Sequence, residues 1–154
     1  MKERKRGFEI AKGFENSEIN LPVRNTKYSA GYDFQAAEDC IIPAFKPGQK
    51  PTLVKTGIKS FMQDDEMLLL YNRSSNAGKR GLVLANGVGV VDKDYYGNES
   101  NDGAIMFAFF NIKDTDFEIK KGDVIGQGIF QKYLIADDDI ANGERKGGFG
   151  STDK

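Results

Sequence analysis

The apolar residues of this chain come in short runs separated by clusters of glycine, proline, asparagine and aspartate. Short runs bounded by such turn residues are typical of β-strands. The main runs are Asp33-Phe34, Leu53 to Phe61, Met67 to Tyr71, Leu82 to Leu84, Val88 to Val91, Ala104 to Ile112 and Val124 to Ile135. Long amphipathic helical patterns are absent, and the best short helix candidate begins at Ser74-Ser75 and ends near Gly78 or Gly81. The pattern therefore predicts an all-β fold with one short helix.

Two of these runs predict how the strands are buried. Every second residue from 54 to 62 is suited to a buried face, as expected for a strand with one face in the core. These residues are Val54, Thr56, Ile58, Ser60 and Met62. The stretch Ile105 to Phe110 is continuously apolar, which is typical of a strand covered on both faces, by a second sheet or by another subunit. A chain of 154 residues fits one domain over 1–154, a sandwich or jelly roll, with 143–154 as a loose tail.

Composition excludes several chemistries. The chain has no histidine and one cysteine, Cys40. It therefore lacks an imidazole base, a histidine-ligated metal, an internal disulfide and any multi-cysteine metal site. The net charge of -1 argues against bulk nucleic-acid binding, which needs a basic face. Catalysis must use carboxylates, Arg, Lys, Ser, Tyr, backbone amides or a hard metal.

The start of the chain is locally basic, with the letters MKERKR over residues 1–6. No apolar segment follows it, so it does not read as a signal peptide. It is interpreted as a solvated arm, with a subunit or phosphate contact as the alternative. No stretch approaches the ~20 apolar residues of a membrane span. We expect a soluble, cytoplasmic protein without a membrane partner.

The most informative segment runs from Asn86 to Gly97 and alternates Gly and Val before Asp and Tyr. We expect a strand, a turn and a return strand, whose glycines let backbone groups approach a ligand. Asp92 follows a Val-Val pair that we expect to be buried, which is a suitable place for a held carboxylate. An ordinary hairpin is the alternative.

Three further segments could contact a ligand. Arg73-Ser74-Ser75 precedes the short helix, where hydroxyls, free N–H groups and a guanidinium suit a phosphate; a capped helix with a surface arginine is the alternative. Asp33 is either a turn acid or a metal contact. Gln127 is either a solvent-facing residue or a ligand contact.

The end of the chain, Arg145 to Thr152, places a lone Phe149 among glycines, beside hydroxyls and an arginine. An aromatic ring can stack on a planar base, and Arg, Ser and Thr can meet phosphate oxygens. The segment is interpreted as a mobile lid, with a plain flexible tail as the alternative.

Taken in order, these segments resemble the five motifs of the trimeric dUTPase family. The motifs look like Ala30 to Phe34, Asn72 to Ser75, Gly87 to Gly97, Gly122 to Gln127, and Arg145 to Thr152. The resemblance covers residues ~20–152. It implies a jelly-roll subunit in a homotrimer, in which three chains build each active site and the tail of one closes the pocket. It also implies hydrolysis of dUTP to dUMP and pyrophosphate, which limits uracil in DNA and supplies dUMP for thymidylate synthesis.

The resemblance assigns roles to residues one by one. Asp92 matches the carboxylate that activates the attacking water, and a carboxylate is ionised at neutral pH without an imidazole. Mg²⁺ is the implied metal, with Asp33 matching the acid that holds its water shell. The matched contacts to the substrate's phosphates are Arg73, Ser74, Ser75 and Gln127. In the tail, Arg145, Ser151 and Thr152 match contacts to the γ-phosphate, and Gly150 matches a further substrate contact. The matched contacts to the nucleoside are Asn86, Gly87, Val91, Tyr95 and Phe149. Among these, Tyr95 matches the ring under deoxyribose and Phe149 the ring stacked on uracil.

Three positions depart from the family pattern. Tyr96 stands where an Arg is common, Glu99 to Asp102 look like an insertion, and Arg145 stands four residues before Phe149 instead of the commoner five. Lys146 could share the role of Arg145. Such variation is similar to some bacteriophage and Gram-positive members.

Two other functions stay open at this stage. A dCTP deaminase or a bifunctional relative shares the fold, but the Glu that those enzymes carry is absent from Phe107 to Phe110. A dUTPase with an added regulatory role would bind a protein partner, for which the 99–102 insertion is the candidate surface.

Overall fold

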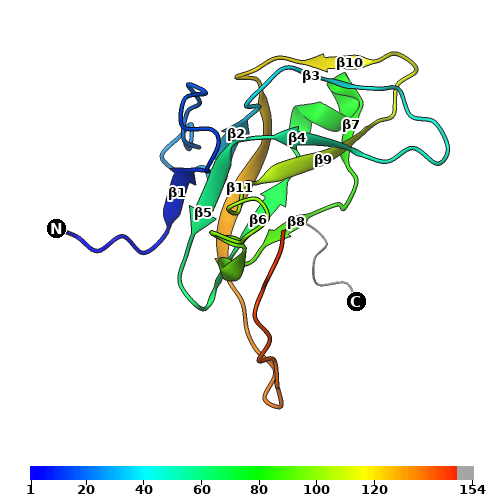
Figure 1. Ribbon diagram of the computed structural model, residues 1–154. Helices are drawn as coiled ribbons and strands as arrows, with labels where there is room; N and C mark the ends of the chain where they lie inside the picture. The colour runs from blue at the N-terminus through cyan, green and yellow to red at the C-terminus, as the bar shows by residue number, and fades with distance from the viewer. Residues whose placement is uncertain (149–154) are drawn as a thin grey trace.

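The computed structural model describes residues 1–148 of the chain, and they form an almost entirely β structure (Figure 1). Phe149, Gly150, Ser151 and Thr152, which we predict to close the site, lie outside the described residues. The strands are β1 (Gly7–Ile10), β2 (Tyr32–Gln35), β3 (Cys40–Ile42), β4 (Thr52–Lys55), β5 (Ile58–Phe61), β6 (Glu66–Tyr71), β7 (Leu82–Leu84), β8 (Gly89–Val91), β9 (Met106–Asn111), β10 (Phe117–Ile119) and β11 (Val124–Lys132). Two short helical elements, η1 (Asn76–Arg80) and η2 (Lys93–Tyr95), complete the described secondary structure.

Two antiparallel sheets form the body of the molecule. One has the order β2-β11-β6-β8 and the other β4-β9-β7, while β1 pairs with β5 and β3 with β10 at the margins. The core between them contains Phe34 from the first sheet and Phe107 from the second, with their ring centroids 5.6 Å apart. Non-consecutive strands lie side by side in both sheets. The predicted jelly-roll-like β-sandwich is therefore confirmed.

The predicted alternation of burial is confirmed, although the run that carries it is divided. Val54, Thr56, Ile58 and Ser60 are each at most 2% exposed, and Met62 is 6% exposed. However, β4 ends at Lys55 and β5 begins at Ile58, and the two strands pair with β9 and β1 respectively. Burial on one face thus continues across a change of sheet, which periodicity alone does not reveal.

The segment after β6 contains the predicted short helix. Residues 74–80 are helical, and Gly81 ends the helix with a φ of 70°. The alternative of a helix capped by serine is not supported at Ser75, whose side chain at the N-cap makes no capping hydrogen bond.

The segment after β8 corrects two other expectations. β8 pairs with β6 instead of with a return strand, and η2 follows it directly. Only one valine of the expected buried pair is buried, since Val91 is 6% exposed and Val90 is 59% exposed. Successive side chains of a strand point to opposite faces, so adjacent valines on an edge strand cannot both face the core.

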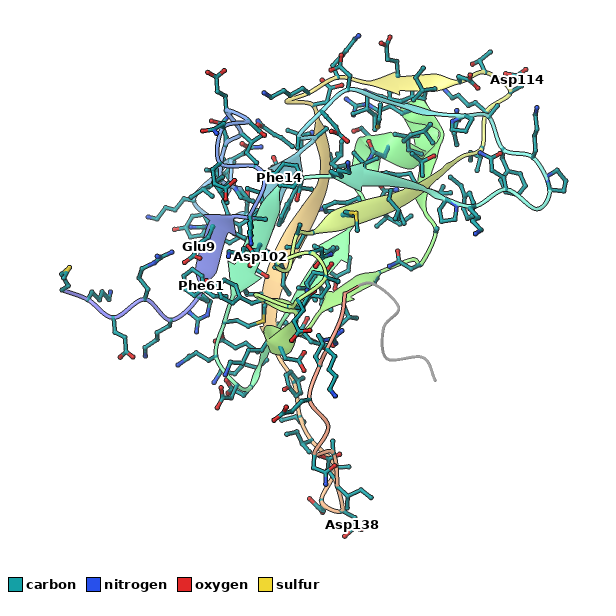
Figure 2. All side chains as sticks on the ribbon, in the orientation of Figure 1. Glu9, Phe14, Phe61, Asp102, Asp114 and Asp138 are labelled. Carbon is teal, nitrogen blue, oxygen red and sulfur yellow. The ribbon has the colours of Figure 1, made fainter. Side chains whose placement is uncertain are left out.

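After β11 the chain runs away from the body and returns beside β8, as the orange-to-red trace of Figure 1 shows. Asp138 lies near the far tip of this excursion (Figure 2). The excursion carries exposed apolar side chains, including Leu134 and Ile140. Within residues 1–148, no helix is long and apolar enough to cross a membrane.

Candidate active site

A pocket of about 210 Å³ lies beside β8, and we call it the Asp92 pocket. β8 is an edge strand, since it pairs only with β6 in its sheet. An edge strand presents backbone N–H and C=O groups to whatever lies beside it. The pocket is lined by Leu70, Asn86, Gly89, Val90, Val91, Asp92, Tyr95, Ile105, Met106, Arg145 and Gly148. Five of the predicted site residues, from Asn86 to Arg145, therefore line one pocket.

Asp92 is held at the mouth of this pocket by the tail. Arg145 donates from Nη2 to Oδ2 of Asp92 over 2.8 Å and from Nε to Oδ1 of Asp94 over 2.7 Å. The Arg145 side chain is only 13% exposed, whereas those of Asp92 and Asp94 are 54% and 58% exposed. The hydrogen bond to Asp94, together with the nearby negative charges, raises the pKa of Arg145. The predicted base and the predicted tail arginine are thus direct partners.

Tyr95 forms a buried wall of the same pocket. It is 9% exposed, and its hydroxyl donates to the carbonyl oxygen of Ala104 over 3.1 Å. The η2 turn brings it here, since the Tyr95 N–H donates to the carbonyl of Asp92 over 3.1 Å. One tight turn therefore places a carboxylate and an aromatic ring on the same pocket.

A second group of predicted residues lies away from β8, toward the β2 edge of the same sheet. We call Asp33, Arg73 and Gln127 the Asp33 cluster. Gln127 of β11 is the direct cross-strand partner of Asp33 of β2, so both side chains lie on one face. Gly31 leaves the space for Gln127, because a Cβ at Gly31 would lie 2.1 Å from its Oε1. Oδ2 of Asp33 accepts a hydrogen bond of 2.6 Å from Asn25.

Arg73 is fixed by the loop between β6 and η1. Its Nη1 donates to the carbonyl of Val124 over 3.2 Å, and its backbone N–H donates to Oδ1 of Asn72. The fully buried Asn76 donates to that same Oδ1 and to the carbonyl of Ile125. Arg73 and Asp33 line one shallow pocket of about 500 Å³. Ser74 and Ser75 follow Arg73 as the first helical residues.

Within one chain, the Asp92 pocket and the Asp33 cluster are well separated. Val91 pairs with Leu68 and Gln131 pairs with Met67, so Asp92 stands about four residues along the sheet from Gln127. At about 3.4 Å per residue and about 4.8 Å per strand, the backbones of Asp92 and Asp33 are roughly 19 Å apart. Asp92 lines one pocket, and Asp33 and Arg73 line a different one.

Several residues at these two sites were not predicted from the sequence. Asp94 is the second partner of Arg145, and its signal was the Asp92-x-Asp94 spacing on one tight turn. Leu70, Ile105 and Met106 also line the Asp92 pocket, but their apolar pattern is the same as that of core strands. Asn25 contacts Asp33 from a loop that carries no motif.

Asp33 is also the predicted metal contact. Residues 1–148 contain no group of three or more His, Cys, Asp or Glu arranged to hold a metal ion. Mg²⁺ commonly uses only one or two carboxylates and keeps its waters and substrate phosphates as other ligands. The partly buried Asp33, next to Gln127 and sharing a pocket with Arg73, fits such a site.

Comparisons with known proteins identify relatives over almost the whole chain. The dUTPase family model matches residues 17–153. A deoxyuridine 5'-triphosphate nucleotidohydrolase of Lactococcus lactis is 48% identical over 149 residues, which are 96% of this chain and 97% of the relative. One from Debaryomyces hansenii is 38% identical over 143 residues, with 87% and 81% covered.

Solved dUTPase structures have the same fold as this chain. A dUTPase from Streptococcus mutans superposes with a TM-score of 0.79 at 41% identity, covering 85% of this chain and 98% of that one. A mutant dUTPase from phage phi11 of S. aureus, described as coordinating a structural Mg(II) ion, superposes with a TM-score of 0.69 at 18% identity. It covers 91% of this chain and 98% of its own. The similarity to Gram-positive and phage proteins was expected from the sequence.

Proposed function

Because this chain belongs to the dUTPase family, it hydrolyses dUTP, and we propose that Asp92 activates the water that attacks the α-phosphorus, releasing dUMP and pyrophosphate. The observation that carries this proposal is the exposed Asp92 carboxylate at the mouth of a pocket on an edge strand. An ionised carboxylate within reach of a water can accept its proton as the new phosphorus–oxygen bond forms. The pyrophosphate leaves with the electrons of the bond that breaks.

Arg145 competes with that water for the carboxylate. One oxygen of Asp92 already accepts a hydrogen bond from the Arg145 guanidinium. The oxygens of a triphosphate are strong alternative acceptors for the same guanidinium. We infer that Arg145 exchanges Asp92 for the γ-phosphate when nucleotide binds, with Lys146 beside it, and that this exchange leaves Asp92 free to orient the water.

The nucleoside end of the substrate fits the Asp92 pocket. The unpaired edge of β8, together with Asn86, Gly87 and Val91, offers backbone and amide groups to the edge of a uracil ring. A slot made of backbone leaves little space for the methyl group of thymine. The buried Tyr95 ring, which lines this pocket, is proposed to pack under deoxyribose, and Phe149 of the tail is proposed to stack on the base.

The phosphate end fits the Asp33 cluster. Arg73 is anchored by the Val124 carbonyl, and its guanidinium and the amide of Gln127 can donate to α- and β-phosphate oxygens. The hydroxyls of Ser74 and Ser75 are proposed to add donors. Asp33 would hold Mg²⁺ through its water shell, and the bound ion supplies charge that offsets the negative charge of the phosphates.

The separation of the two groups supports a homotrimer. With backbones roughly 19 Å apart, Asp92 and Asp33 of one chain do not meet at the same triphosphate. A second copy can supply the missing half, since a heterologous interface that closes into a ring joins different patches of neighbouring subunits. We propose that each site combines the Asp92 pocket of one subunit with the Asp33 cluster of another and the 143–154 tail of the third, so that Arg145, once released from Asp92 of its own chain, serves the site of a neighbouring subunit.

Measuring pyrophosphate release from every deoxy- and ribonucleoside triphosphate, with and without Mg²⁺, tests the proposal. We expect turnover of dUTP alone, dependent on Mg²⁺. Equal turnover of dTTP or UTP contradicts the proposed base and sugar contacts. Formation of a uracil nucleotide from dCTP would instead favour the deaminase or bifunctional alternative, and a regulatory partner would be sought at the 99–102 surface.

A further inference from the structure

The Tyr95 ring is held from its hydroxyl end by the loop that follows it. The hydroxyl donates to the carbonyl of Ala104 over 3.1 Å and accepts from Nδ2 of Asn101 over 2.8 Å. With one bond donated and one accepted, a tyrosine hydroxyl is fixed in direction. The ring can therefore not slide or tilt without breaking a hydrogen bond.

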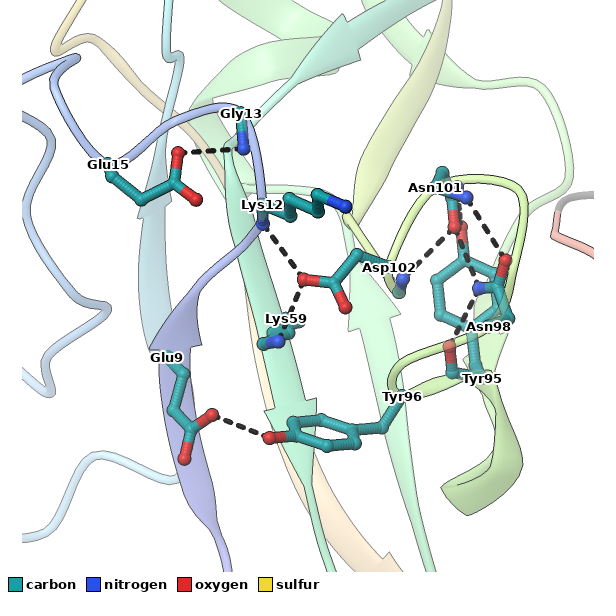
Figure 3. Close-up of polar contacts among 11 residues, drawn as sticks. Glu9, Lys12, Gly13, Glu15, Lys59, Tyr95, Tyr96, Asn98, Asn101 and Asp102 are labelled. Atoms are coloured by element: carbon teal, nitrogen blue, oxygen red, sulfur yellow. Dashed lines mark hydrogen bonds and ion pairs between the residues drawn. The ribbon is translucent and has the colours of Figure 1, made fainter.

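Asn101 is itself held in place by the buried side chain of Asn98. Nδ2 of Asn98 donates to Oδ1 of Asn101 over 2.7 Å and to the backbone carbonyl of Tyr95 over 2.8 Å. Oδ1 of Asn98 accepts from the backbone N–H groups of Ser100 and Asn101. Figure 3 shows this closed network between the loop and both ends of the tyrosine. The Asn101 amide thus has its rotamer set by the loop.

The loop is tied to the rest of the fold through Asp102. Its Oδ2 accepts hydrogen bonds from Nζ of Lys59 over 2.7 Å and from the backbone N–H of Lys12 over 2.8 Å (Figure 3). These two hydrogen bonds lower the pKa of Asp102. β5 and the segment after β1 therefore act as a fixed support for the loop.

We propose that Asn101 is a positioning residue that fixes the Tyr95 ring and thereby sets how strongly the enzyme prefers deoxyribose over ribose. The inference rests on the proposed contact of Tyr95 with the sugar. A ring excludes a 2′-hydroxyl by steric overlap only if it cannot retreat, and the Asn101 side chain supplies one of the two hydrogen bonds that prevent the retreat. Asn101 lies in the 98–103 loop, to which no substrate contact is assigned above.

The test compares kcat/KM for dUTP with kcat/KM for UTP in Asn101→Ala, Tyr95→Phe and the double variant. Glu99→Gln is the control, because Glu99 lies in the same loop, is exposed, and makes no side-chain hydrogen bond among the described contacts. We expect Asn101→Ala to lower the dUTP/UTP preference by roughly fivefold, the effect of losing one hydrogen bond. Tyr95→Phe, which removes both hydrogen bonds of the hydroxyl, should give at least as large a loss. The double variant should show no further loss than Tyr95→Phe, and the control should keep the wild-type preference.

A merely structural role for Asn101 would lower both kcat/KM values together and leave their ratio unchanged, and that result overturns the inference. So does an additional loss when Asn101→Ala is introduced into the Tyr95→Phe background, because the two changes would then act separately. Tyr95→Phe keeps the ring and the loop sequence but removes the hydroxyl with its bonds to Asn101 and Ala104, so it tests whether holding the hydroxyl sets the preference even if Asn101→Ala does not fold. Equal wild-type turnover of UTP and dUTP would instead overturn the proposed sugar contact, and this inference with it.

Discussion

Arg145 and Asp92 form a direct ion pair of 2.8 Å between residues 53 positions apart in the sequence. Arg145 is mostly buried in this pair, and Asp94 holds its other side. The tail therefore reaches the candidate base in the described structure through a guanidinium that is also suited to phosphate. We propose that this ion pair between Arg145 and Asp92 separates when nucleotide binds.

Replacing Asp92 with Asn should lower kcat for dUTP at least about a hundredfold, the low end for loss of a general base. The amide keeps the shape of the side chain but cannot accept the proton of the attacking water. Asp94→Asn is the matched control, since Asp94 shares the Arg145 contact and a similar exposure. Steady-state kinetics at saturating dUTP measure both, and near-normal kcat in Asp92→Asn would remove Asp92 as the base.

Mixing two inactive variants should restore activity if subunits share each site. Asp92→Asn and Arg73→Ala damage different halves, which lie too far apart in one chain to serve one substrate. After denaturation and joint refolding, about a quarter of the sites will combine two intact halves. The dUTPase rate of the mixture, compared with each variant refolded alone, is the measurement. A mixture with no more activity than its components contradicts a shared site.

Truncating the chain after Gly143 should abolish most activity while keeping the oligomer. The cut removes Arg145 and Phe149 but leaves every strand of residues 1–148, the last of which ends at Lys132. Light scattering after gel filtration measures the assembly, and pyrophosphate release measures the reaction. Full activity in the truncated chain would show that the tail does not close the site.

Replacing Gly148 with Ala should raise KM for dUTP several-fold by disturbing how the tail seats. A Cβ at Gly148 would lie 2.7 Å from Oγ of Ser100 and 3.1 Å from Nδ2 of Asn101. The control is Gly143→Ala in the same tail, where a Cβ would meet nothing within 4 Å. If both variants have the same kinetics, the contact between the tail and the 98–103 loop is not used in the reaction.

Protonation of Glu66 should destabilise the fold at acid pH. The hydrogen bond from Arg6, together with the backbone N–H of Gln63, lowers the pKa of this 3%-exposed carboxyl. The stability that it contributes is therefore present above about pH 4.3, the usual Glu value, and is lost as pH falls through the lowered pKa. Thermal unfolding followed from neutral to acid pH measures this dependence.

Arg6→Ala supplies the comparison for that pH dependence. It should lower the Tm by several degrees near neutral pH and flatten the acid loss, because Glu66 then lacks its main partner. Arg4→Ala, which removes the exposed 3.5 Å pair with Glu9, should change little. An unchanged pH profile in Arg6→Ala would contradict the assigned origin of the acid loss.

Local patterns were sufficient for much of the fold. The alternation from Val54 to Met62 predicts which side chains face the core, because the period of two is a property of the strand itself. The glycines at 78 and 81 predict an end of the short helix at one of them for the same local reason, and the helix ends at Gly81. The order of motif segments identifies the family. The pairing of β8 with β6, and the change of sheet between Lys55 and Ile58, were not predictable because they depend on which distant edge a strand meets.

The sequence alone determined an all-β chain without histidine, in which catalysis and phosphate binding depend on carboxylates and arginines. Only the tertiary structure decided where those groups lie: Asp92 against Arg145, Asp33 opposite Gln127, and Tyr95 against Asn101. Residue type and strand period are encoded within a few positions of the chain. Cross-strand register and loop closure join positions far apart in the sequence, and only the packing of the whole fold sets them.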